Sequence, residues 1–475
     1  MNKTSLLIYC LALVPMLFTS CSNEDEKVDW NGVEVKNIKL KEILHQKGFT
    51  FNEKGRLVLN EKATNTTMLD LSGTKITDLS GLDILPNLME VNLSNNDYGP
   101  IFDFSTLPKK ISSVDLTGNK VYDFEGLVST EFINDEMKTT VLHPLTKLYL
   151  PATAKFNVED LVPFHKTSTS TDIQMQDAMG KLQTYNTLRE IPDEALRIYL
   201  KSKFISLFPD NGDLFDIAKR MALKEEGESI SLPWRSENGA IKSIEGIEYF
   251  INNPFYKPFF VAIDCSALSN VSYLAPRNNI KALSLRNINM PDGIDLSKAS
   301  KLCNLALDNN DHLTTLDLSN TLIANQKFED IDNTTIGNSL DITRCKNLEE
   351  IKFPFPNEGI VSGLTIGGVP KLKKIDLSFI KATQELALLQ MSNCAITYPD
   401  LKYRYDVATG TLTKLEEVPD GSGIGFAISK DVFDMPATKE FFTKFRSKLS
   451  DRYRGYDKDT DYSYNLGGYR WSKYL

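Results

Sequence analysis

Histidine, cysteine and carboxylate side chains are the residues of this chain that could support catalysis or metal binding, but their spacing favours neither. The chain has four histidines among 475 residues, and none lies four positions from another or in a cluster with cysteines. A zinc site, or a nucleophile with its base, requires such neighbours. The chain contains neither a GxSxG nucleophile turn nor a GxxxxGK[ST] phosphate loop. We therefore expect a protein that is not an enzyme and that uses no cofactor.

Two acidic turns are similar to calcium-binding loops but lack required ligands. Residues 209–213 keep Asp210 and Asp213 without the alternating spacing and the distal glutamate of such a loop. Residues 457–461 do alternate, yet Tyr462 stands where a glycine is needed and Gly468 where a glutamate is needed. We interpret both segments as solvated turns and expect no metal site.

The end of the chain is rich in aromatic side chains, which are candidates for binding. Tyr464, Tyr469 and Trp471 lie among seven tyrosines and tryptophans between residues 453 and 474. Aromatic rings with a polar tip stack on sugars or anchor protein partners, and they also pack as the cap of a preceding domain. Both interpretations stay open, so we take these three residues as candidate binding residues.

Aspartates recur at the middle position of short apolar phrases and form a second set of candidates. Asp317, Asp341 and Asp376 each stand between two aliphatic residues. If these phrases are strands, their middle side chains point outward and form acidic columns. Such columns either bind a partner or are a solvated face.

The elements that would position these residues are set by a repeated phrase. Leu71, Leu93 and Leu116 occupy the same place in LDLSGT, VNLSNN and VDLTGN, 22 and then 23 residues apart. This period is typical of repeats that each supply one strand and one return segment and bury their apolar side against their neighbours. Beyond residue 280 a second series of phrases follows about 11 residues behind the first, as Ile294 follows Leu283. That offset predicts strands on both sides of each repeat.

These phrases resemble the leucine-rich repeats of internalin-type proteins, most clearly TKITDLSGLDILPNL at 74–88. The resemblance implies an α/β repeat solenoid with two leucine-rich repeat arrays, each behind a helical N-terminal cap. It also implies a second array that is flattened, with strands on both sides, and a small C-terminal cap. The expected domains are a signal peptide at 1–20, a lipidated acidic linker at 21–37, a first array with its cap at 38–166, a linker at 167–190, a second array with its cap at 191–398, and a capping region with the aromatic tail at 399–475.

The first residues indicate export and lipid attachment. Lys3 precedes an apolar run, 6–18, that is shorter than the ~20 residues needed to span a bilayer, as in a secretory signal. The run ends in Phe-Thr-Ser-Cys, which resembles the lipobox of bacterial lipoproteins and implies acylation of Cys21. The acidic cluster in residues 22–26, Ser-Asn-Glu-Asp-Glu, resembles a signal for the outer face of the outer membrane. We expect a lipid-anchored protein of a Gram-negative outer membrane that faces the cell exterior.

Charge and resemblance together bound the function. With 54 basic and 63 acidic residues the chain has a net charge of −9, which argues against nucleic acid as a partner. The resemblance implies non-catalytic binding of a protein partner at the cell surface, in adhesion or host interaction. Two alternatives remain open: a glycan-binding accessory lipoprotein for nutrient uptake, and a structural component of the envelope. The expected partners are therefore a protein or glycan ligand and, through Cys21, the membrane.

Overall fold

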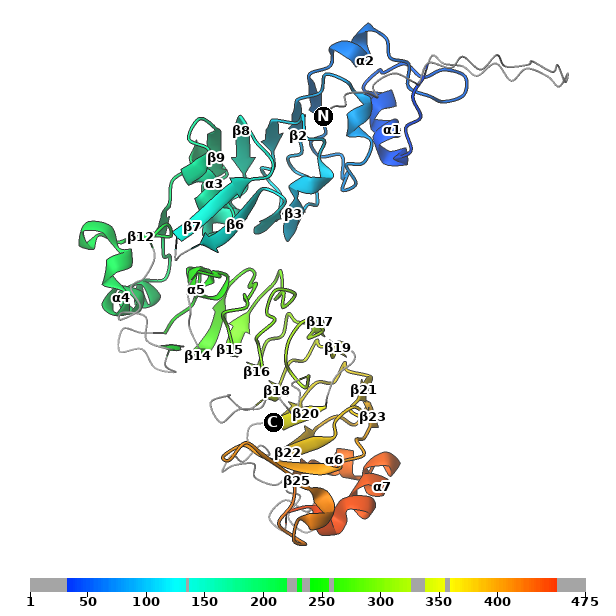
Figure 1. Cartoon of the computed structure of the whole chain (residues 1–475), viewed down its shortest axis with the longest axis vertical. Helices are drawn as coiled ribbons and strands as arrows, with labels where there is room; N and C mark the ends of the chain where they lie inside the picture. Colours follow the sequence, from blue (N-terminus) through cyan, green and yellow to red (C-terminus); the bar gives the residue numbers. More distant parts are fainter. Residues whose placement is uncertain are drawn as a thin grey trace, which may run out of the picture.

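The computed structural model describes residues 32–133, 136–219, 229–232, 240–255, 260–325, 338–354 and 359–450. Figure 1 shows two arms that meet in a bend. The first arm holds a six-stranded sheet and the second a ten-stranded sheet, and several two-stranded sheets accompany them.

The six-stranded sheet has the order β1-β2-β4-β8-β9-β10. Its strands pair in parallel as far as β9, and β10 turns back antiparallel to β9. Equivalent aliphatic residues face one another along the sheet, such as Leu69, Val91 and Val114, and all three are buried. The bounds are β1 Met68–Asp70, β2 Glu90–Asn92, β4 Ser113–Asp115, β8 Lys147–Leu150, β9 Asp172–Gln176 and β10 Leu182–Thr184.

Buried asparagines end the strands of the first arm. The Asn119 side-chain amide donates to the carbonyl oxygens of Leu93 at 3.0 Å and Leu116 at 2.9 Å. Its Oδ1 accepts a hydrogen bond from the Asn96 backbone at 3.0 Å. Because a buried polar group needs partners, this arrangement fixes where β2 and β4 stop and the chain turns.

The ten-stranded sheet runs β13-β14-β15-β16-β18-β20-β22-β24-β25, and β26 also pairs with β22. All of its pairings are parallel except that of β24 with β25. Leu283, Leu305 and Leu340 are in register and fully or almost fully buried. The bounds are β13 Ser229–Leu232, β14 Phe260–Asn270, β15 Ala282–Asn289, β16 Asn304–Asp308, β18 Ser339–Thr343, β20 Ile360–Gly367, β22 Ala382–Leu389, β24 Tyr403–Asp406, β25 Thr411–Lys414 and β26 Gly425–Ile428.

Five short pairs of strands accompany the two large sheets. Three of them are parallel and two are antiparallel. The parallel pairs are β3 Ile101–Asp103 with β5 Asp123–Glu125, β17 Thr315–Asp317 with β19 Glu350–Lys352, and β21 Lys374–Asp376 with β23 Ala395–Thr397; the antiparallel pairs are β6 Val128–Ile133 with β7 Glu136–Val141, and β11 Leu188–Glu190 with β12 Leu214–Asp216.

The helices of the described residues are short. Three begin at polar caps: Asn37 accepts from the backbone of Leu40 before α1 at 3.0 Å, Asn60 from that of Ala63 before α2 at 3.1 Å, and Asp193 from that of Leu196 before α4 at 3.0 Å. The α-helices are α1 Ile38–Gln46, α2 Glu61–Asn65, α3 Leu161–Thr167, α4 Glu194–Lys203, α5 Glu248–Ile251, α6 Lys430–Phe433 and α7 Pro436–Phe445. None of these helices is long and apolar enough to cross a membrane.

The predicted fold class, an α/β repeat solenoid with two helically capped arrays, is wrong. The described residues fold mostly as strands, in several separate sheets of mixed direction, and their longest helices have ten residues. The repeated phrase specifies a strand and its turn, but the segments between strands lack the apolar spacing that makes a helix. They form irregular chain or 3-10 turns, such as η1 Leu82–Ile84. Residues 167–190, expected as a linker, add β9 and β10 to the first sheet.

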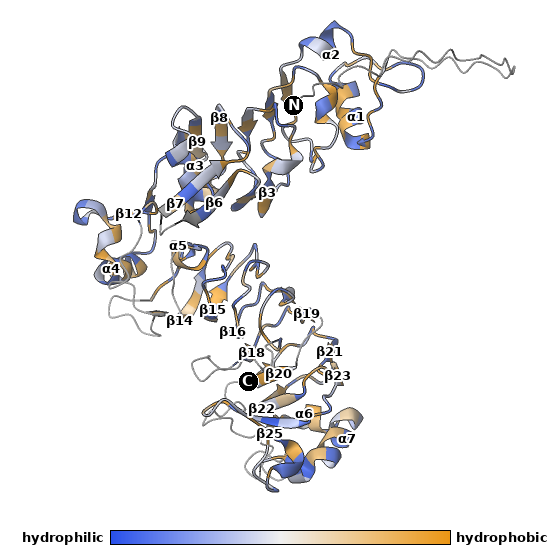
Figure 2. Ribbon diagram, in the orientation of Figure 1, coloured by the Kyte–Doolittle hydropathy of each residue, from blue (hydrophilic) through white to orange (hydrophobic). Residues whose placement is uncertain are grey.

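Hydropathy follows this architecture. Figure 2 shows apolar and polar residues alternating along many strands of both arms. The apolar residues form one large core in each arm, with a separate small cluster of Ile360, Ala382 and Tyr405 in the second, and Phe156, Val158 and Val162 from the first arm pack into the large core of the second. The two arms are therefore joined by apolar contacts as well as by the polar groups considered next.

Candidate functional site at the junction of the arms

Charged side chains of both arms meet at the bend. The first arm contributes β5 and the loop between η3 (Ala152–Phe156) and α3, and the second contributes the segments before and after β15. Loops supply most of these residues, which is usual for residues that carry function on a rigid scaffold. This junction is the densest group of buried ionisable side chains among the residues that the structure describes.

Arg277 is the central cation of the junction. Its Nη2 donates to Asp123 Oδ2 at 2.5 Å and its Nε to Glu159 Oε2 at 2.7 Å. A third bond, at 3.0 Å, runs from Nη1 to the backbone carbonyl of Ala275. The side chains of Arg277 and Asp123 are each only 4% exposed. Because Asp123 belongs to the first arm and Arg277 to the second, this buried ion pair links the two arms.

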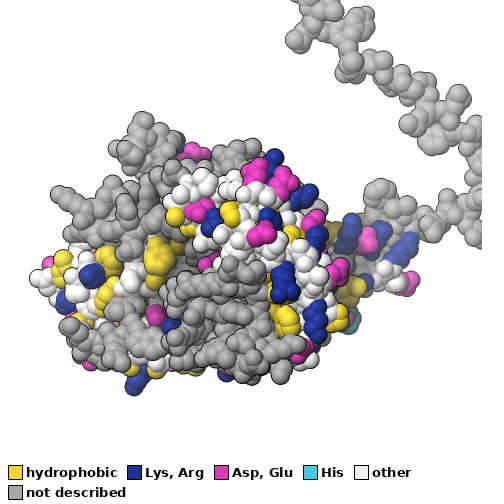
Figure 3. Space-filling model, turned by 90° about the horizontal axis from the view of Figure 1, so that it is seen from below, with side chains coloured by type: hydrophobic (Ala, Val, Ile, Leu, Met, Phe, Trp, Pro, Cys, Tyr) yellow, Lys and Arg dark blue, Asp and Glu magenta, His cyan; other side chains and the backbone are white. Residues whose placement is uncertain are grey.

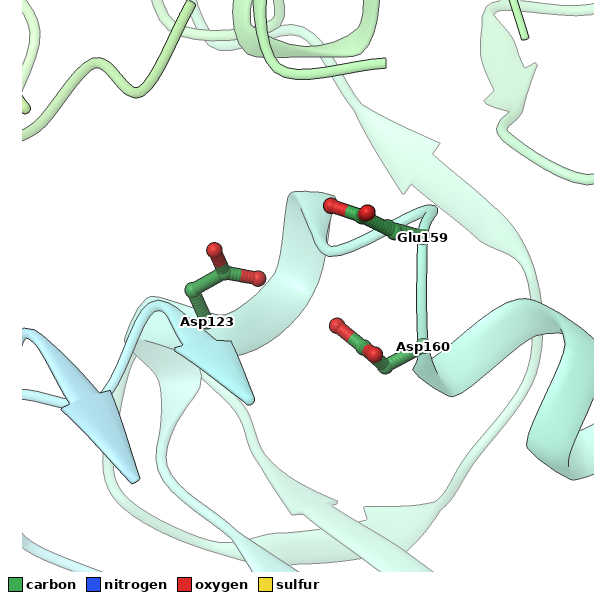
Figure 4. Close-up of side chains that lie close together, drawn as sticks. All are labelled: Asp123, Glu159 and Asp160. Carbon is green, nitrogen blue, oxygen red and sulfur yellow. The ribbon is translucent and has the colours of Figure 1, made fainter. Parts of the chain in front are cut away.

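Three carboxylates converge beside Arg277. Figure 4 shows Asp123, Glu159 and Asp160, one oxygen from each lying within 4.8 Å of the others. Such a group could hold a metal ion, but here a guanidinium supplies the positive charge. The Asn157 amide also donates to Asp123 at 2.7 Å and to Asp160 at 3.2 Å. The triad is thus already bound by side chains of the protein.

The protonation states balance the buried charge. Burial opposes ionisation of Asp123, but the charges of Arg277 and Lys298 outweigh it and hold the pKa of Asp123 below its ordinary value. Burial, reinforced by the charges of Asp123 and Glu159, raises the pKa of Asp160 well above its ordinary value. Burial therefore favours the neutral form of Asp160, whereas the neighbouring cations favour the ionised form of Asp123.

A second buried acid, Glu248, lies beside the junction. Its Oε2 accepts a hydrogen bond from the backbone of Gly246 at 2.6 Å, and burial raises the pKa of its carboxyl to about 7. Glu248, Asp123 and Arg277 line a cavity of about 20 Å³. That volume suits about one water molecule, so the buried part of the junction has no room for a substrate.

The rim of the junction carries a second link between the arms. Asp292 accepts from Lys120 Nζ and from the Tyr122 hydroxyl, both at 2.6 Å. The Tyr122 ring packs against Tyr273 of the second arm, with centroids 4.9 Å apart. The hydrogen bonds from Lys120 and Tyr122 outweigh the effect of burial and lower the pKa of Asp292. This half-exposed rim is the part of the junction that a ligand can reach.

A separate charged ladder crosses the ten-stranded sheet. Arg286 Nε lies 2.7 Å from Asp308 Oδ2, and Arg344 donates from two nitrogens to the same carboxylate. Burial raises the pKa of Asp308, but hydrogen bonds from Arg344 help to bring that pKa below its ordinary value. The ladder joins neighbouring strands and satisfies its own charges, which favours a structural role.

The structure does not bring the predicted binding residues together. Asp317 and Asp376 are exposed at the ends of β17 and β21, where Asp317 pairs with Lys352 at 3.8 Å and Asp376 accepts from the backbone of Ser378. Asp341 lies in a different sheet, on β18.

The predicted acidic column therefore fails at Asp341. This residue is half-buried between small side chains of the neighbouring strands, its Oδ1 has no hydrogen-bond partner, and burial raises the pKa of its carboxyl to about 7. The predicted residues Tyr464, Tyr469, Trp471 and Cys21 lie outside the described residues.

Sequence reasoning missed the junction. Asp123 and Arg277 are 154 positions apart, and no motif surrounds either residue. The only local signal is Asn157 with Asp160, three positions apart, where the Asn157 side chain accepts from the backbone of Asp160. That spacing indicates a turn and not an interaction between arms.

Comparison with known proteins gives no assignment. No protein-family model matches the chain, and no curated protein matches it in sequence. Its function has to be inferred from its own residues.

Proposed function

We propose that this protein is a non-catalytic lipoprotein of the cell surface that binds a protein partner, in adhesion or host interaction. Cys21 would anchor it in the outer membrane of a Gram-negative bacterium, with the two arms outside the cell. The observation that carries the proposal is the buried pair of Arg277 with Asp123, which fixes one arm against the other.

A fixed angle between two long arms favours binding of a macromolecule. Association is costly when a surface must first be ordered, and a surface held in place by buried contacts avoids much of that cost. The surface itself is polar: Figure 3 shows acidic and basic side chains interspersed on the described part of one face. Interspersed charges favour selective recognition of a complementary surface over nonspecific adhesion.

The test compares binding with the junction intact and broken. Soluble protein of residues 22–475 is immobilised, and purified extracellular-matrix and mucin proteins are passed over it. We expect saturable binding of at least one of them, weakened about tenfold by Arg277→Met because a looser junction must be ordered on binding. The matched control is Arg404→Met, which removes a half-buried pair with Asp406 far from the bend.

Two results would overturn the proposal. One is the absence of saturable binding to every protein of the panel. The other is equal affinity of the parent protein and Arg277→Met, because a partner that contacts both arms has to sense their angle.

A further inference from the structure

A groove of about 410 Å³ lies on the rim of the junction. Its walls are the turns at 96–100 and 118–122 of the first arm, together with Asp292 of the second. These turns lead into the paired strands β3 and β5, and Figure 1 places β3 on the side of the first arm that faces the second. The volume falls within the range of ligand-binding pockets, about 300–1,000 Å³.

Three polar side chains in the groove are held in fixed positions. Asp292 is bound by Lys120 and by the Tyr122 hydroxyl, as described above. Backbone hydrogen bonds from Lys120 to Tyr98 at 3.1 Å and from Tyr122 to Pro100 at 2.8 Å tie the two turns together. Ligand binding at these groups therefore needs little reorganisation of the protein.

A fourth polar group has no partner within the described residues. Asp97 is exposed, lines the groove, and makes no hydrogen bond or ion pair with any of them. An ionised carboxylate accepts strong hydrogen bonds and donates none, so a ligand that binds Asp97 in place of water has to present hydroxyl or amine donors.

The lining favours a saccharide over a peptide. A protein segment binds chiefly through apolar or aromatic anchors in desolvated pockets, whereas the exposed and half-exposed lining of this groove is Pro100 and Tyr122 beside two carboxylates, a lysine and backbone. A sugar presents hydroxyl donors to Asp97 and Asp292 and an apolar ring face to Tyr122. With Asp97, Lys120 and Asp292 the groove carries a net negative charge, which disfavours acidic sugars.

We infer that this groove binds a short stretch of uncharged oligosaccharide, with Asp97 as the main acceptor of sugar hydroxyls. The inference goes beyond the binding of a protein partner and does not depend on it. The same sugar chemistry occurs in free polysaccharide and in the glycan of a glycoprotein, so the experiment includes both sources.

The experiment screens soluble protein of residues 22–475 on an array of uncharged, sialylated and sulfated oligosaccharides. The best uncharged oligosaccharide is then titrated calorimetrically, both free and attached to a carrier protein. We expect saturable binding of uncharged glycans only, weakened about tenfold or more by Asp97→Asn because a charged acceptor is lost. The matched control is Asp83→Asn, an exposed aspartate of the same arm outside the groove.

Each outcome decides the inference. Equal binding of the free and the attached oligosaccharide supports a site for sugar alone, and binding of the attached form only would show that the carrier is recognised and overturn it. Binding that Asp97→Asn leaves unchanged would place the sugar elsewhere, and a silent array would remove the site. The protein could also bind a protein partner and no glycan, with that binding weakened by Asp97→Asn. This result would support the proposed function and refute this inference.

Discussion

Removal of the Arg277 guanidinium tests the junction most directly. In Arg277→Met the stem of the side chain is retained, while Asp123 and Glu159 lose the guanidinium that donates to both and Asp123 keeps the hydrogen bond from Asn157. Asp123 remains almost fully buried, and its nearest remaining cation is Lys298, whose Nζ is 3.6 Å away. Breaking a buried ion pair from one side costs about 3–5 kcal/mol, since the other charge stays buried and uncompensated. We expect a loss of that size in the free energy of unfolding.

Urea denaturation followed by circular dichroism measures this loss, and small-angle X-ray scattering reports the angle between the arms. Arg404→Met is the control: the pair of Arg404 with Asp406 is about one-quarter exposed, and we expect a loss of about 1 kcal/mol or less. The double variant Asp123→Asn/Arg277→Met removes both charges and should recover part of the stability. A loss below about 1 kcal/mol in Arg277→Met, with unchanged scattering, would refute the view that this pair fixes the bend.

Three further predictions concern single sites. Burial raises the pKa of the Glu248 carboxyl from 4.5 to about 7, so the folded protein binds this proton more tightly than the unfolded chain does. The free energy of unfolding should therefore fall by roughly 3 kcal/mol as pH rises from 4.5 to 7. Glu248→Gln should show a smaller fall in urea stability from pH 4 to pH 8 than the parent protein. Asn119→Ala removes the hydrogen bonds of this amide to the carbonyls of Leu93 and Leu116 and from the backbone N–H groups of Asn96 and Tyr98. It should cost about 2–3 kcal/mol by urea denaturation, whereas a cost under 1 kcal/mol would contradict the role of this amide in ending the strands. Gly359→Ala places a Cβ 2.0 Å from the Phe379 carbonyl oxygen at a φ of +74° and should lower the melting temperature well beyond Gly73→Ala, where φ is +63° and the added Cβ meets nothing within 4 Å.

The strands were predictable from the sequence because their signal is local. The phrases around Leu71, Leu93 and Leu116 each place a buried leucine directly after a strand and, in the last two, an asparagine beyond it. The buried leucine and the asparagine of the turn both lie within a few residues of the strand, so a short repeated phrase contains them and predicts the strand. The signal for the start of α1 at Ile38 is equally local, because the Asn37 side chain directly before the helix caps it.

The fold class and the junction were not predictable in the same way. The resemblance implied a solenoid with helical caps, whereas the described residues form several separate sheets, and the residues between two strands at Leu82–Ile84 form a single 3-10 turn. Asp341 was placed outward by its middle position in a phrase, yet neighbouring strands half-bury it. Arg277 finds Asp123 only once both arms are folded, and a contact over that sequence separation leaves no local pattern.

The antiparallel strand β10 closes one side of the first sheet. A parallel ladder that ended on β9 would present a row of free backbone groups along five residues, Asp172–Gln176. Instead β10 covers part of that row and is itself only three residues long, mostly exposed and flanked by Lys181. Short, polar edge strands discourage pairing with a second molecule. Two copies of the protein would therefore not join their first sheets edge to edge through β10, which makes this edge a poor basis for a polymer.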